Sequence, residues 1–193
     1  MTKPNVRNDY LLYVKETSRQ SVLSILFRYP EKEFSLSDLA KEAGVAKANI
    51  GHILDELIRN DLIEVKKLTK IWRIKAKQQS WYFIRNKIIY NMNFIYNSGI
   101  VEFLYDYFKH PKVIALFGSF RKGDDISESD IDIAIERDEG EYVVTRLKEL
   151  SEFENLIKRR IHIHLFNRKN VDINVFNNIA NGIVLMGFLE VKP

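Results

Sequence analysis

Two aspartates spaced two residues apart, Asp130 and Asp132, are the residues of this chain best suited to chemistry. They lie in the run Asp-Ile-Asp-Ile-Ala-Ile, whose strict alternation predicts a β-strand. Because strand side chains alternate between faces, both carboxylates project from the same side. Two carboxylates in one small space repel each other, and a divalent cation between them explains the pair most simply. Oxygen ligands alone favour Mg²⁺ or Mn²⁺.

A glycine-serine pair precedes these aspartates, directly after the apolar run from Val113 to Phe117. Gly118 permits a sharp turn in which backbone N–H groups approach an anion, and a helix starting at Ser119 would add partial positive charge. Arg121 and Lys122 add two full positive charges. We therefore predict that these four residues bind a triphosphate whose oxygens complete the metal shell, so that an in-line attack on phosphorus follows.

The order strand, Gly118-Ser119, a loop with Gly123, and Ser129-Asp130-Ile131-Asp132-Ile133 resembles the nucleotidyltransferases of the DNA polymerase β superfamily. The likeness is closest to the minimal nucleotidyltransferases of archaea and bacteria. It implies an α/β (α+β) fold with a mixed sheet flanked by helices, an NTP as substrate, and Asp130 and Asp132 as catalytic, metal-binding residues. It also implies an alternative, since such domains are often paired with small helical toxins: an antitoxin-like modifier of a toxin-like partner protein.

A third strand is predicted from Ile161 to Phe166, where the resembled family usually carries a third carboxylate. His162 and His164 occupy the polar positions instead. Three interpretations remain open: the histidines are bystanders, one of them binds a softer ion such as Mn²⁺ or Zn²⁺ or acts as a base, or catalysis has been lost. Asp172 is not expected to replace the missing group, because Asn170 predicts the cap of a helix that runs through Ile173, Phe176 and Ile179.

Three short helical patterns open the chain, over residues 18–29, 39–43 and 47–60, with Gly44 between the second and third. Strand patterns at 62–65 and 71–75 predict a hairpin after them. The segment from Leu36 to Ile63 resembles the winged-helix DNA-binding domains of prokaryotic transcription regulators, especially from Leu39 to Val45. In that arrangement the third helix enters the major groove and the hairpin lies along the phosphate backbone. The expected DNA contacts are Lys47, Asn49, His52, Lys66, Lys67, Lys70 and Arg73.

Charge is unevenly distributed along the chain. Residues 1–80 contain 15 lysines and arginines against 10 acids, whereas residues 81–193 contain 15 against 16. A basic first half and a balanced second half indicate two units with different partners, the basic one being a candidate for binding nucleic acid. We expect a winged helix-turn-helix domain at 1–77, connecting helices at 78–110 and a nucleotidyltransferase-like domain at 111–193.

The connecting segment is rich in aromatic residues at helical spacing, with a break at Ser98-Gly99. Packing within the chain or a homodimer explains this pattern better than stacking on bases. Further on, Tyr142 to Phe153 has helical spacing through Val143, Leu147 and Leu150 and is expected to form a helix.

The chain has 193 residues and no cysteine. No apolar run reaches membrane-spanning length, and Met1 to Asp9 lacks the apolar core of a signal peptide. We therefore expect a cytoplasmic protein without membrane contact. The function that fits best is a metal-dependent nucleotidyltransferase with a DNA-binding domain. The alternative is a DNA-binding transcriptional regulator whose nucleotidyltransferase-like domain is catalytically degenerate.

Overall fold

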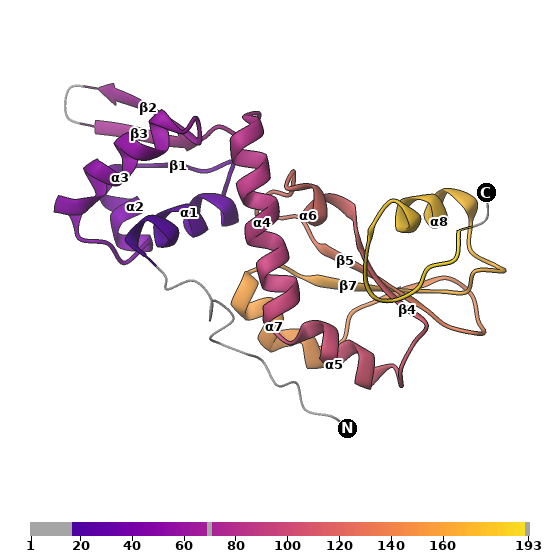
Figure 1. Cartoon of the computed structure of the whole chain (residues 1–193). Helices are drawn as coiled ribbons and strands as arrows, with labels where there is room; N and C mark the ends of the chain where they lie inside the picture. Colours follow the sequence, from indigo (N-terminus) through magenta and orange to yellow (C-terminus); the bar gives the residue numbers. More distant parts are fainter. Residues whose placement is uncertain (1–16, 69–70, 192–193) are drawn as a thin grey trace. The chain divides into compact units, whose positions relative to one another are not determined.

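The computed structural model describes residues 17–68 and 71–191. Lys70, one of the predicted DNA contacts, lies outside these ranges. The described chain forms two compact units that divide between Tyr90 and Asn91 (Figure 1). Within the described ranges, no helix combines the length and apolar character that crossing a membrane requires.

Three helices open the first unit: α1 (Ser18–Arg28), α2 (Leu36–Glu42) and α3 (Lys47–Arg59). Thr17 and Gln20 form a capping box at the start of α1. Ser35 accepts the Asp38 backbone N–H at the start of α2. Gly44, with φ +64°, provides the left-handed turn that separates α2 from α3. The three predicted helices are therefore confirmed, with no end shifted by more than three residues.

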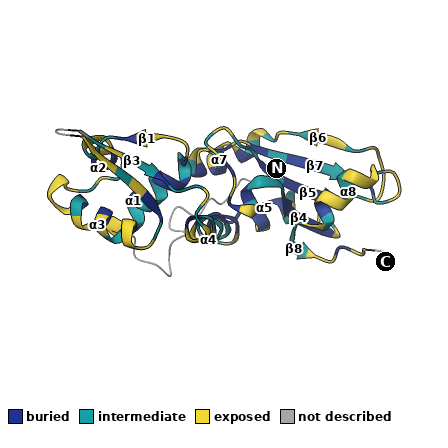
Figure 2. Cartoon of the chain, turned by 90° about the horizontal axis from the view of Figure 1, so that it is seen from above, coloured by how far each residue is buried: buried dark blue, intermediate teal, exposed yellow. Residues whose placement is uncertain are grey.

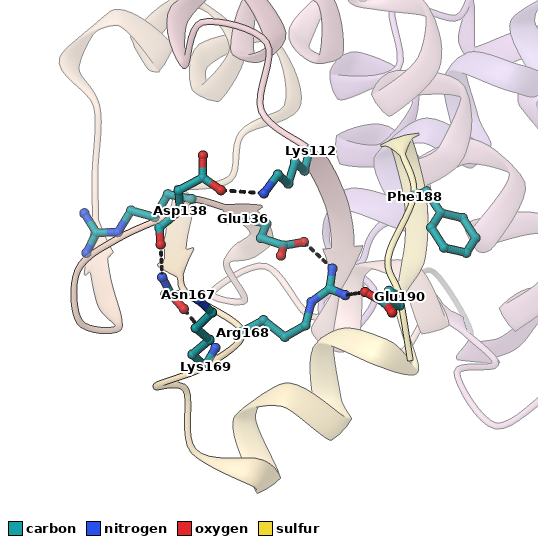
Figure 3. Close-up of a pocket in the computed structure, with 9 residues that line it drawn as sticks. Lys112, Glu136, Asp138, Asn167, Arg168, Lys169, Phe188 and Glu190 are labelled. Carbon is teal, nitrogen blue, oxygen red and sulfur yellow. Dashed lines mark hydrogen bonds and ion pairs between the residues drawn. The ribbon is translucent and has the colours of Figure 1, made fainter. Parts of the chain in front are cut away.

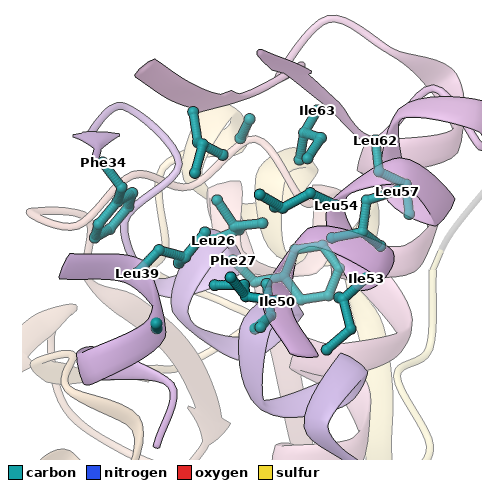
Figure 4. Packing of buried hydrophobic residues seen from close by; sticks show 14 of the residues in the cluster. Leu26, Phe27, Phe34, Leu39, Ile50, Ile53, Leu54, Leu57, Leu62 and Ile63 are labelled. Atoms are coloured by element: carbon teal, nitrogen blue, oxygen red, sulfur yellow. The ribbon is translucent and has the colours of Figure 1, made fainter. Parts of the chain in front are cut away.

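A three-stranded antiparallel sheet completes this unit, with β1 (Glu33–Phe34), β2 (Ile63–Leu68) and β3 (Ile71–Ala76) in the order β1-β3-β2. The apolar stripe of α3 packs against α1 and the sheet, and Leu26, Leu54 and Ile63 lie in the middle of that core (Figure 4). Three helices followed by a two-stranded hairpin, with one short strand added at its side, make this unit a winged helix.

Two helices follow, α4 (Trp81–Asn97) and α5 (Ile100–Tyr107). The predicted break at Ser98-Gly99 is confirmed, and Gly99 takes a φ of +89° there. The buried side chains of α5 include Ile100, Phe103 and Leu104, which explains its aromatic and aliphatic composition as packing within the second unit.

The second unit contains a mixed five-stranded sheet in the order β6-β7-β5-β4-β8. Its strands are β4 (Val113–Phe117), β5 (Ile131–Glu136), β6 (Val143–Thr145), β7 (Ile161–Phe166) and β8 (Ile183–Gly187). Only β5 and β7 pair in parallel. The remaining helices are the short α6 (Gly118–Lys122), a 3-10 turn η1 (Lys148–Leu150), α7 (Ser151–Ile157) and α8 (Ile173–Ala180).

The central strands are buried on both faces, whereas exposed residues are found on β6 and α8 (Figure 2). Ile131, Ile133 and Ile135 are at most 1% exposed and fill one face. Ala134 lies on the other face, where it joins Ile179 of α8 in a smaller cluster. Asp132 projects to this second face, because it alternates with the isoleucines.

Two expectations were wrong in this unit. Residues 143–145 form the edge strand β6 and the helix begins only at Ser151, because β6 finds an antiparallel partner in β7. The cap of α8 is Asp172 rather than Asn170: its carboxylate accepts the backbone N–H groups of Asn174 and Val175 at 2.8 and 3.3 Å. Asp172 is thus used as a helix cap.

Candidate active site

The turn from β4 into α6 forms the first wall of the candidate site. Gly118 has a φ of +77°, a conformation that side chains disfavour, and it turns the chain from the buried strand into the helix. Phe120 is 1% exposed and anchors α6 in the core. Ser119 and Arg121 are half-buried and Lys122 is exposed, so all three can be reached by a ligand at this turn.

Asp132 lies directly against this turn. It is the register partner of Phe117 across β4 and β5. A Cβ atom placed on Gly118 would come within 2.4 Å of Asp132 Oδ2. Asp130 precedes β5 by one residue, and each of the two carboxylate side chains is 25% exposed. The structure therefore brings the predicted carboxylates and the Gly118 turn together at one end of the sheet.

Strand β7 supplies the second wall, through its parallel pairing with β5. His164 Nε2 is 3.0 Å from Asp132 Oδ1, and His162 Nδ1 is 3.5 Å from Asp130 Oδ2. Arg160, just before β7, donates from Nε to Asp130 Oδ1 over 2.8 Å. Nitrogen groups from one strand thus face both carboxylates.

The His164 ring continues the chain of polar contacts away from Asp132. Its Nδ1 lies 2.6 Å from the Tyr142 hydroxyl, just before β6. The ring of Phe117 meets the imidazole edge-on at a centroid distance of 4.7 Å. Burial, and then the Asp132 carboxylate, raise the pKa of Tyr142 above its usual value of 10.0, so that the phenol stays protonated at neutral pH.

The donors fit one divalent cation better than two. Within residues 17–68 and 71–191, no group of three or more acidic, histidine or cysteine side chains is close enough to hold a metal ion. Asp130 and Asp132 offer carboxylate oxygens on one face, and phosphate oxygens of a nucleotide would have to complete six-fold coordination. Both ring nitrogens of His164 already face polar partners.

A buried polar cluster supports the loop that leads from α6 to β5. Asn91 donates to the Phe120 carbonyl at 2.7 Å and to Asp125 Oδ1 at 2.9 Å. Arg159, just before β7, pairs with Asp125 Oδ2 at 3.5 Å, and both side chains are at most 3% exposed. The cluster connects the loop to α4 and to the start of β7. It therefore fixes the position of the Gly118 turn relative to β7.

Three of these residues were missed as site residues when only the sequence was considered: Tyr142, Arg160 and Asp125. Arg160 carried a weak signal, because residues 160, 162 and 164 alternate on the polar side of a predicted strand. Tyr142 carried none, since its segment has helical spacing.

A second hollow of about 550 Å³ lies at the opposite end of the sheet, beyond the last residue of β5 (Figure 3). Five of its charged side chains form ion pairs with one another. Arg168 binds Glu136 at 2.8 Å and Glu190 at 2.6 Å, and Lys112 binds Asp138. This ion-pair network joins the end of β5 to the segments after β7 and β8.

The predicted DNA contacts lie in the first unit. Lys47, Asn49 and His52 are exposed on α3, which agrees with an outward face on the second helix of the helix-turn-helix. On the hairpin, Lys66 is exposed, while Lys67 sits over the Trp72 ring at 4.1 Å. Arg73 pairs with Glu33 at 3.3 Å, which reduces the free positive charge of the hairpin.

A family model matches residues within the second unit. Residues 99–187 match the family model described as polymerase beta, nucleotidyltransferase, from the start of α5 to the end of β8. These residues therefore form a nucleotidyltransferase-like domain, and both walls of the site lie within it. No curated protein matches the chain.

Among solved structures, reduced HlyU from Vibrio cholerae matches with a TM-score of 0.30 and 16% identity. The match covers 51% of this chain and 85% of HlyU.

Proposed function

We propose that the second unit is a metal-dependent nucleotidyltransferase, which moves a nucleoside monophosphate from an NTP to the hydroxyl group of an acceptor. One observation carries this proposal: the Asp132 carboxylate lies against the positive-φ turn at Gly118, with Asp130 beside it at the same end of the sheet. The absence of cysteine from the chain favours a reducing, cytoplasmic setting.

Each residue has a distinct role in this scheme. Asp130 and Asp132 hold one Mg²⁺ or Mn²⁺, which when bound neutralises charge on the phosphates. The Gly118 and Ser119 backbone approaches the triphosphate, and Arg121 and Lys122 offset its charge. The acceptor hydroxyl oxygen then loses its proton to solvent and forms a bond to the α-phosphorus, while the bond from that phosphorus to the bridging oxygen breaks and pyrophosphate leaves. Arg160 orients Asp130 through its hydrogen bond.

The proposal is tested by replacing both carboxylates with amides of the same shape. Asp130→Asn together with Asp132→Asn should lower Mg²⁺-dependent transfer from labelled ATP or CTP to protein or nucleic acid by about 10²-fold or more, because charge stabilisation at the phosphates is lost. Asp124→Asn is the matched control, since Asp124 is exposed in the neighbouring loop. No transfer by the unaltered protein, together with nucleotide binding that the double variant retains, would refute the proposal.

The first unit is proposed to bind double-stranded DNA through α3 and the hairpin. We expect Lys66→Ala combined with Lys67→Ala to weaken binding to any duplex and to reduce the slope of log affinity against log salt by about 2, because two phosphate contacts are lost. Fluorescence anisotropy at several salt concentrations measures this slope. Lys148→Ala removes an exposed lysine from the second unit and should leave the slope of log affinity against log salt unchanged. Failure to bind any duplex at low salt would contradict the proposal.

A DNA-binding regulator with a degenerate catalytic domain is the second candidate. It is favoured by the contacts of Arg160 and His164 with the two aspartates, which occupy carboxylate oxygens that a metal ion would need. A specific operator footprint whose affinity is unchanged in the double aspartate variant would support this candidate.

A further inference from the structure

Tyr142, His164 and Asp132 form a hydrogen-bonded chain that joins the segment before β6 to the candidate metal site. The Tyr142 hydroxyl is 2.6 Å from His164 Nδ1, and His164 Nε2 is 3.0 Å from Asp132 Oδ1. The imidazole is 9% exposed and is held at its side by the edge of the Phe117 ring. Rotation of this ring would therefore break both hydrogen bonds at once.

The positions of the protons in this chain follow from donor and acceptor chemistry. An ionised carboxylate only accepts hydrogen bonds, so His164 Nε2 must carry the proton that lies between it and Asp132. A neutral imidazole then has an unprotonated Nδ1, which needs a donor. The half-buried phenol of Tyr142 is that donor, because a phenol is protonated at neutral pH and its oxygen lies 2.6 Å from Nδ1.

We propose that Tyr142 holds His164 in the Nε2-protonated tautomer and that His164 thereby fixes the Asp132 carboxylate against the Gly118 turn, with Oδ2 left for the cation. Both act as positioning residues, and His164 is not a metal ligand because neither ring nitrogen has a free lone pair. This inference rests on the proposed function, since it assigns Asp132 to the cation. Outer partners of this kind typically change metal affinity or activity by about 10- to 100-fold.

Direct Mn²⁺ binding, followed by electron paramagnetic resonance, tests the positioning role without any turnover. Tyr142→Phe should weaken Mn²⁺ binding about 10-fold, and His164→Ala should weaken it further, towards about 100-fold. His164→Gln places an amide donor near the position of Nε2 and should recover most of the loss, whereas His164→Asn, whose amide is too short to reach Asp132, should not. If His164 had a merely structural role, the His164→Gln and His164→Asn variants would bind Mn²⁺ with the same affinity.

The chain offers a matched control for the tyrosine. Tyr105 is half-buried in the same unit and stacks on the His110 ring at a centroid distance of 4.6 Å. Tyr105→Phe removes a hydroxyl from a second tyrosine–histidine pair and should leave Mn²⁺ binding unchanged. Equal Mn²⁺ affinity of the Tyr142→Phe and Tyr105→Phe variants would overturn the proposal.

The tautomer itself is read from ¹⁵N spectra of histidine-labelled protein, which contains four histidines. The His164 signals are identified by their loss in His164→Gln. We expect a protonated Nε2 in the unaltered protein and a mixture of states in Tyr142→Phe; a protonated Nδ1 with a bare Nε2 in the unaltered protein would refute the assignment. These spectra decide the tautomer even if no nucleotidyl transfer is found, so failure of the proposed function and failure of this inference are distinguishable.

Discussion

Gly118→Ala is expected to lower nucleotidyl transfer strongly while leaving the second unit folded. The added methyl group would sit 2.4 Å from Asp132 Oδ2, far inside contact distance, so the carboxylate must rotate away from the turn. The backbone φ of +77° at this position also lowers the free energy of unfolding by about 1 kcal/mol when the residue is alanine. Because the steric conflict involves the end of a side chain, the fold should survive, but the proposed cation would lose one of its two carboxylates. Transfer and Mn²⁺ affinity should both fall about 10²-fold.

Gly44→Ala separates the effect of the unfavourable backbone φ from the effect of the contact with Asp132. Gly44 has a similar φ of +64°, and a Cβ atom there would meet nothing within 4 Å. This variant should therefore lose a comparable amount of unfolding free energy, about 1 kcal/mol, without any loss of transfer. Transfer rates and thermal unfolding curves of both variants make the comparison. Full activity in Gly118→Ala would show that the contact between Asp132 and the turn has no catalytic importance.

Asp125→Ala is expected to destabilise the second unit more than any substitution of a surface acid. Asp125 is 1% exposed, accepts a hydrogen bond from Asn91, and pairs with the buried Arg159. Its removal takes away the carboxylate that faces this buried guanidinium. Breaking a buried pair in this way typically costs about 3–5 kcal/mol. For a unit of this size, such a loss should lower the melting temperature by roughly 10 °C or more.

Two further variants make this result interpretable. Asp124→Ala changes the adjacent exposed acid and should alter the melting temperature by less than about 2 °C. Asp125→Asn keeps an acceptor for Asn91 but removes the charge that faces Arg159, so its loss of stability should be large as well. If Asp125→Ala and Asp124→Ala melt at the same temperature, the buried cluster does not hold the loop.

The strands and turn of the candidate site could be predicted from the sequence, because their signals are local. Apolar residues over 113–117 and strict alternation after Asp130 specify two strands whatever surrounds them. Gly118 between the first strand and a helix is likewise read directly from residue type. The helices of the winged-helix unit follow from serine and threonine caps and from the stripe on α3.

Which atoms contact the aspartates was decided by the tertiary structure, although the sequence already placed His162 and His164 on the polar side of a predicted strand. Arg160, His162 and His164 reach the carboxylates because β7 pairs with β5 in parallel and in one particular register, across about thirty residues of chain. Tyr142 reaches His164 because β6 adds to the far side of β7, although its own segment has helical spacing. Pairing of this kind depends on which strand edge is free elsewhere in the fold. The sequence therefore determined the carboxylates and the turn, and the sheet determined their partners.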